Sequence, residues 1–333
     1  MSETARLRSA RFREQREADW KRLEELVTRA ERGAAARLSF EESQELARLY
    51  RSATTSLSVA RDVSLDKALL VYLEALVARA FIAVYAPQET LGGVVTRFVA
   101  RSAPQAMRRS WLGLLLGFLA MGLGGIIAYA LYFQDSAWYY TFMPAGLAGG
   151  RDPGASTEML RDALFDTDHN VLASLGAFAA FLFSHNTRVA FFAFALGIFA
   201  CVPSFLLTLY NGLVLGAFVA LHVERGLGYE VFGWLSIHGV TELSAIAIAA
   251  GGGFGLGLAF LFPGDMPRKD ALRAASKDAV KLAIIAAIML FAAGLLEGFG
   301  RQLIQSTEVR LAVGWGIGAL WLGWFLLASW RRR

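Results

Sequence analysis

Long apolar runs constrain this chain more than any other feature, because stretches of about 18 or more mostly apolar residues recur after residue 110. In lipid, every backbone N–H and C=O group must be satisfied within the protein, so such runs predict membrane-crossing α-helices. The composition agrees, since 56% of the 333 residues are hydrophobic and the mean hydropathy is +0.45. We therefore predict an all-α, polytopic transmembrane helical bundle.

The apolar runs predict about six spans, some of them short or broken. Their predicted ranges are 111–133, 189–209, 212–222, 231–262, 282–299 and 311–330. The third is shorter than a bilayer requires, and polar side chains interrupt the fourth. Basic residues gather before the first span, after the fourth and at the C-terminal end. The positive-inside rule then predicts a multi-pass protein of the cytoplasmic membrane with both termini in the cytoplasm.

The first 110 residues hold 19 Lys and Arg against 14 Asp and Glu, which is the whole charge excess of the chain. Their charges are interleaved along predicted helices, which disfavours a nucleic-acid-binding patch. Residues 3–32 predict one helix, and Ser39 with Glu42 forms a capping-box pattern that predicts the start of a second. We predict that residues 1–110 form a basic cytoplasmic helical domain, ending in an interfacial helix over 89–110.

Residues 111–333 are predicted to form the transmembrane domain, within which residues 134–183 form a loop on the outer side. The acidic residues of that segment suit the side opposite to the basic loops. Asp152 followed by Pro153 matches the pattern of a helix N-cap and first turn. They predict an amphipathic helix that runs from there toward Phe183.

The main candidate site is the pair His238 and Glu242, four residues apart within the fourth predicted span. On a helix they share one face and can hydrogen-bond or share a proton. Ionisable groups inside a membrane segment usually face a bundle interior or an aqueous cavity. Three interpretations stay open here: a structural lock between helices, a proton- or ligand-binding pair, and a catalytic metal site. The zinc-protease pattern H-E-x-x-H needs a second histidine, so we predict neither a metal nor any other cofactor.

Four further polar residues complete the predicted intramembrane polar site. Asn186 and Arg188 precede the second span, where they are interfacial anchors, or else Arg188 supplies a counter-charge for Glu242 or for an anionic ligand. Asn211, followed by glycine, favours a tight turn between two helices. Glu297 has no partner that the sequence reveals.

These residues together resemble the stage II sporulation protein M family of integral membrane proteins, over roughly residues 90–330. The matching positions are Asn186-x-Arg188, Asn211-Gly212 with Gly216, His238-Gly239-x-x-Glu242-x-x-Ala245-Ile246, and Ala292-Ala293 to Glu297. The resemblance implies a polytopic protein of the cytoplasmic membrane. The family's namesake anchors peptidoglycan-degrading proteins during engulfment, and other members occur beside genes for a MoxR-type ATPase.

The leading functional hypothesis is a non-enzymatic membrane scaffold that recruits or organises envelope-remodelling proteins of the cell wall. The alternative is a transporter or channel for a small anion, lipid or proton that uses the His238 and Glu242 site. Expected partners are membrane lipids, a second copy of the chain in a homodimer, and cell-wall-remodelling proteins or a MoxR-type ATPase system. No nucleic-acid partner is expected.

Overall fold

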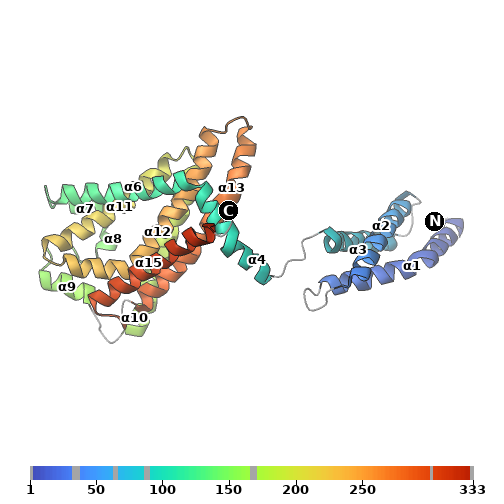
Figure 1. Cartoon of the computed structure of the whole chain (residues 1–333), viewed down its shortest axis with the longest axis horizontal. Coiled ribbons are helices and arrows are strands. Elements are labelled where there is room, and N and C mark those ends of the chain that lie inside the picture. Colours follow the sequence, from blue (N-terminus) through green and yellow to red (C-terminus); the bar gives the residue numbers. More distant parts are fainter. Residues whose placement is uncertain are drawn as a thin grey trace. The chain divides into compact units, whose positions relative to one another are not determined.

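A computed structural model describes residues 3–31, 38–62, 67–85, 91–165, 171–300 and 303–330. Every regular element within these ranges is a helix, which confirms the all-α prediction (Figure 1). The chain divides into two compact units, Met1–Thr96 and Arg97–Arg333. Each has its own hydrophobic core.

The first unit is built mainly from three helices, α1 (Glu3–Glu31), α2 (Phe40–Asp62) and α3 (Lys67–Tyr85). It also includes most of the short helix α4 (Leu91–Arg97). The predicted capping box is confirmed at the start of α2. There the backbone N–H of Ser39 donates to the Glu42 carboxylate over 2.8 Å, and the N–H of Glu42 donates to the Ser39 hydroxyl over 3.1 Å. The core is made by one stripe from each helix, including Trp20, Leu23, Leu49, Leu57, Leu73 and Leu76.

Ion pairs join the three helices around this core. Arg22 meets Glu45 at 3.0 Å and Arg29 meets Glu42 at 2.5 Å, so two arginines of α1 hold the first turns of α2. Glu42 also accepts the cap hydrogen bond. The Arg29 guanidinium holds the pKa of the Glu42 carboxyl below its usual range, and Arg22 does the same to the pKa of Glu45.

These depressed pKa values predict that acid loosens the contact between α1 and α2. Both carboxylates have folded-state pKa values below the unfolded value of 4.5, so their stabilisation is present above that value. It is lost as the pH falls through the folded-state pKa. Hydrogen exchange of the α2 amides, corrected for intrinsic rates, should therefore speed up below about pH 4.5. A Glu42→Gln/Glu45→Gln variant should lose this pH dependence, and an equally steep response in that variant would contradict the assignment.

Helix α3 is one of the described helices that are long and apolar enough to cross a membrane. It nevertheless buries Leu73 and Leu76 against α1 and α2. Its own charged residues pair with those two helices, Arg79 with Glu31 at 2.8 Å and Glu74 with Arg61 at 2.7 Å. This packing favours a position for α3 within the first unit, Met1–Thr96, which we call the head, over a position across the membrane.

Six long helices make up most of the second unit. They are α6 (Trp111–Tyr132), α10 (Val171–Ala195), α11 (Val202–Glu224), α12 (Gly228–Leu261), α13 (Arg268–Leu295) and α15 (Thr307–Trp330). Two short elements precede them, η2 (Phe98–Ser102) and α5 (Ala103–Arg109). The other short elements lie between the long helices and are α7 (Trp138–Phe142), α8 (Ala145–Ala148), α9 (Thr157–Phe165), η3 (Leu196–Ile198) and η4 (Leu296–Gly300). The segments η2 and η4 are π-helical and η3 is a 3₁₀ turn. Together with α3, the long helices other than α10 give six candidate membrane spans among the described residues.

The predicted spans 189–209 and 212–222 are wrong, because the helix break falls at 196–201 and α11 continues through 212. At the break, a Cβ added to Gly197 would lie 2.2 Å from the carbonyl carbon of Gly253, so α12 approaches too closely for a side chain. Ala200 and Cys201 adopt positive φ angles of 54° and 67° there. Pro203 lies in the first turn of α11, where its missing N–H costs nothing.

The prediction that Asp152 and Pro153 open a helix is also wrong. The Asp152 carboxylate accepts the N–H of Gly154 over 2.7 Å and forms a turn. Helix α9 begins later, where the Ser156 hydroxyl accepts the N–H of Met159 over 3.2 Å. The predicted continuation toward Phe183 crosses residues 166–170, which lie outside the described residues, and α10 begins at Val171.

Contacts between distant segments define the two ends of the second unit. At one end, Tyr132 donates to Glu224 over 2.5 Å, and Tyr229 donates to Glu308 over 3.2 Å. At the other end, the indole of Trp324 donates to the Val99 carbonyl over 3.0 Å. Basic residues are concentrated at this second end, on η2, α5 and the first turns of α13, and include Arg101, Arg108, Arg109, Arg268, Lys269 and Arg273.

Helices α6 and α11 pack with their backbones almost in contact. A Cβ added to Gly124 of α6 would lie 2.0 Å from the Leu209 carbonyl oxygen of α11. The reverse holds for Gly212, whose added Cβ would lie 2.1 Å from the Met121 carbonyl oxygen. Small residues permit such close approach between membrane helices, where dispersion contacts replace the hydrophobic effect as the driving force.

Candidate functional site

Helix α12 positions the predicted pair. It runs without interruption for 34 residues, so the expected break at the polar residues does not occur. His238 and Glu242 stand one turn apart on its buried face, with 4% and 8% of their surfaces exposed. The imidazole Nε2 atom lies 3.9 Å from a carboxylate oxygen of Glu242.

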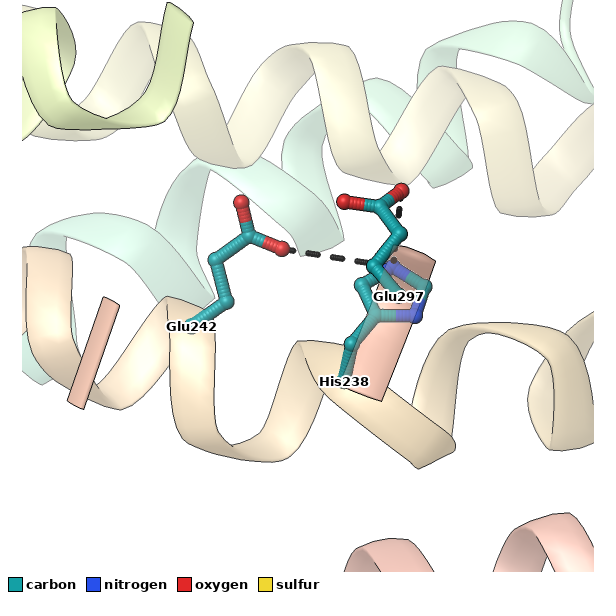
Figure 2. A group of neighbouring side chains, drawn as sticks. All are labelled: His238, Glu242 and Glu297. Atoms are coloured by element: carbon teal, nitrogen blue, oxygen red, sulfur yellow. Dashed lines mark ion pairs between the residues drawn. The ribbon is translucent and has the colours of Figure 1, made fainter. Parts of the chain in front are cut away.

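The structure brings a third ionisable side chain to this pair. Glu297 reaches in from η4, and its carboxylate oxygen lies 3.7 Å from the same Nε2 atom of His238. Figure 2 shows the three side chains converging, with dashed lines from the imidazole of His238 to the carboxyl groups of Glu242 and Glu297. Glu297 is only 4% exposed, so all three are enclosed by the protein.

Close helix packing encloses the cluster. Gly314 of α15 fits directly against α12, since a Cβ added there would lie 2.0 Å from the Ser236 carbonyl oxygen. Within α12, the indole of Trp234 meets the His238 ring edge-to-face at 5.5 Å between centroids. The ring of Trp234, on the same helix, therefore packs against the His238 imidazole.

The cluster offers one imidazole nitrogen and two carboxylate oxygens that all lie within 4.8 Å of one another. Three chemistries suit this set: a charge-assisted polar lock between α12 and η4, a shared proton, and coordination of one metal ion. A search of the described residues for three or more His, Cys, Asp or Glu side chains with metal-ligand spacing finds this cluster.

The other predicted site residues lie elsewhere. Arg188 is exposed and Asn186 half-buried on α10, and no ion pair links Arg188 to Glu242 in the part of the chain described. Asn211 lies within α11, and its amide donates to the Leu207 carbonyl over 2.9 Å, so the predicted turn is wrong. A helical Asn that satisfies its amide on the preceding turn needs no chain reversal.

Two arginines of the second unit that hydrogen-bond to backbone carbonyls, the buried Arg310 and the half-buried Arg151, were missed from sequence. Arg310 is 1% exposed at the start of α15 and donates to the carbonyls of Ile304 (2.7 Å) and Leu164 (3.1 Å). Arg151 donates to the carbonyls of Leu147 and Ala148, both over 3.0 Å. Both arginines stand beside apolar runs, where sequence alone indicates an interfacial anchor. No local pattern distinguishes them from such anchors.

Fold and site together define a polytopic helical membrane protein with an enclosed His–Glu–Glu cluster. The family model described as Stage II sporulation protein M matches residues 111–300, which is more than half of the chain. The chain belongs to the stage II sporulation protein M family, as the resemblance predicted. A second model, described as Domain of unknown function (DUF8413), matches residues 10–86. Searches of curated proteins and of solved structures returned no significant match.

Proposed function

We propose that this protein is a non-enzymatic scaffold of the cytoplasmic membrane that recruits or organises envelope-remodelling proteins of the cell wall. The observation that carries the proposal is the division of the chain. A family membrane unit is joined to a first unit with its own core, and a separate domain model matches within that first unit. A membrane anchor with an additional folded head is the arrangement that recruitment requires.

The charge distribution supports the orientation that a scaffold of this kind needs. The end of the second unit near η2, α5 and the start of α13 is the basic one, and the positive-inside rule favours the cytoplasm for it. Along the chain, the first unit is followed directly by η2 and α5, which belong to this basic end of the second unit. Both termini are then cytoplasmic, and the segment with α7, α8 and α9 faces cell-wall partners.

The head carries an exposed apolar stripe on α3 that suits protein docking. Val71, Phe81 and Ile82 are 58%, 52% and 61% exposed, although their neighbours on the same helix are buried. Exposed apolar patches rimmed by charge mark interaction sites on many proteins. The partners that we propose for the scaffold are cell-wall-remodelling proteins or a MoxR-type ATPase, with the chain itself present as a homodimer among membrane lipids.

The test is chemical cross-linking of the tagged chain in its native membrane, followed by quantitative mass spectrometry. We expect cell-wall hydrolases or an ATPase to be enriched with the wild-type chain. In a Phe81→Ser/Ile82→Ser variant, this enrichment should fall by at least about tenfold, because truncation of central apolar contacts has an effect of this size at other interfaces. The control is Arg13→Ser, an exposed change on α1. Equal enrichment with both variants, or no envelope protein with the wild-type chain, would refute the scaffold.

A transporter or channel is the second candidate, and the enclosed His238, Glu242 and Glu297 cluster favours it. The continuous helices α11 and α12 remove the short and interrupted spans that also suggested a transport site. Solute flux into proteoliposomes would support this candidate only if it required Glu242 and Glu297, because a path through the bundle would pass these groups.

A further inference from the structure

We propose that His238, Glu242 and Glu297 bind one divalent first-row transition-metal ion, of the Zn²⁺ or Mn²⁺ kind. The inference goes beyond the proposed scaffold and does not depend on it. One imidazole nitrogen with two carboxylate oxygens is a donor set used by such ions. Ca²⁺ and Mg²⁺ are disfavoured, because they take oxygen ligands and keep several waters.

The separations between the ligand atoms fit an ion better than direct contact. At 3.7 Å and 3.9 Å, the Nε2 atom of His238 is too far from both carboxylate oxygens for ordinary hydrogen bonds to them. Two ligands of a tetrahedral zinc ion lie about 3.4 Å apart, given bonds of about 2.1 Å. The two distances from His238 exceed this spacing by a few tenths of an ångström, and the two carboxylate oxygens, which lie within 4.8 Å of each other, would have to approach by up to about 1.4 Å through rotation of the glutamate side chains.

The charge of the site also favours a cation. Two carboxylates in one enclosed site repel each other, and the single imidazole can carry at most one positive charge. A divalent ion balances both carboxylates and keeps the imidazole neutral, as metal ligation requires. A proton shared between the carboxyl groups is the competing arrangement, and the experiment separates the two.

The backbone that delivers Glu297 is a second, independent observation. Helix α13 ends at Leu295 and passes into the π-helical turn η4, which holds Glu297. Single π-turns are rare and occur frequently at functional sites. Here the turn brings Glu297, 55 residues after Glu242 in the sequence, within 3.7 Å of His238.

An ion at this place would have a defined structural effect. It would join α12 to the turn that precedes α15, so that two distant parts of the bundle share ligands. Three protein ligands leave a fourth coordination position for water or another small ligand. The proposal assigns no reaction to that position.

The test is metal analysis of the full chain, purified in mild detergent with a tag that binds no metal. The protein is incubated with Zn²⁺ or Mn²⁺, desalted and measured by inductively coupled plasma mass spectrometry. We expect about one ion per chain for the wild type and about a tenth of that or less for His238→Gln and Glu297→Gln, because each removes a ligand. The controls are His222→Gln, a buried histidine of α11, and Glu308→Gln, which should both retain the ion.

X-ray absorption of the wild-type protein covers the case in which variants fail to fold. A shell of oxygen and nitrogen atoms with the scattering of one imidazole would support the site. Sulfur ligation through Cys201, two imidazoles, or wild-type protein that retains no ion after desalting would overturn it. Retention of the ion by a folded Glu297→Gln variant would overturn it as well.

Discussion

Replacing Gly124 with alanine should unfold or severely weaken the membrane unit. The added methyl group would lie 2.0 Å from the Leu209 carbonyl oxygen, so α6 and α11 would have to separate along their whole contact. The obstacle is backbone, which cannot rotate away as a side chain can. We expect a loss near the upper end of overpacking costs, about 3 kcal/mol. Thermal unfolding in detergent, followed by circular dichroism, measures it.

The same helix supplies the matched control. Gly122 has no atom within 4 Å of an added Cβ, so Gly122→Ala makes the same chemical change in open space. We expect it to leave the unfolding temperature nearly unchanged or to raise it, because alanine favours a helix over glycine by up to about 1 kcal/mol. Equal loss of stability in the two variants would show that α6 and α11 do not meet through Gly124.

Arg310→Met should be the most damaging single change among the charged residues of the second unit. The substitution removes donors to the Leu164 and Ile304 carbonyls and to the side chain of Gln305, which the fully enclosed guanidinium now satisfies. Buried acceptors left without donors are costly, so we expect a loss of about 3 kcal/mol. Arg310→Lys should recover only part of it, since a lysine ammonium cannot reproduce the planar fork.

The readout for Arg310 is local as well as global. Hydrogen exchange should accelerate at the end of α9 and the start of α15, the two segments that the guanidinium joins. Arg161→Met is the control, because Arg161 is 58% exposed and meets Glu230 only at 3.8 Å. Its loss should stay below about 0.5 kcal/mol, as for other surface pairs. Comparable effects of the two changes would contradict a central role for Arg310.

Span prediction succeeded where polar residues bound an apolar run. The predicted 111–133, 231–262 and 311–330 correspond to α6, α12 and α15, within a few residues at each end. The break between α10 and α11 was missed because Phe199, Ala200 and Cys201 keep the run apolar through the turn. The break lies where Gly197 packs against Gly253 of α12, and the hydropathy of the sequence does not indicate this tertiary contact.

Only the part of the candidate site that lies on one helix was predictable from sequence. Helical periodicity places His238 and Glu242 one turn apart, and the structure confirms that spacing. The position of Glu297 depends on how α13 and its π-turn are placed against α12, which no local pattern encodes. Arg188 was a reasonable partner on charge alone, but the helix that carries it leaves its side chain exposed.

The hairpin of α12 and α13 has a consequence for how the protein sits in a bilayer. With 34 and 28 residues, these helices are about 51 and 42 Å long, against a hydrocarbon core of about 30 Å. Arg109 and Asp278 form an ion pair at 3.6 Å, and because charged side chains are costly within the hydrocarbon core, we infer that this core ends near Asp278 on α13. About ten residues of α13 precede it, which is a rise of about 15 Å. The α12–α13 hairpin therefore projects beyond the hydrocarbon core on the basic side, by a distance that the helix length sets. Soluble molecules that approach this side meet the hairpin before they meet the lipid headgroups.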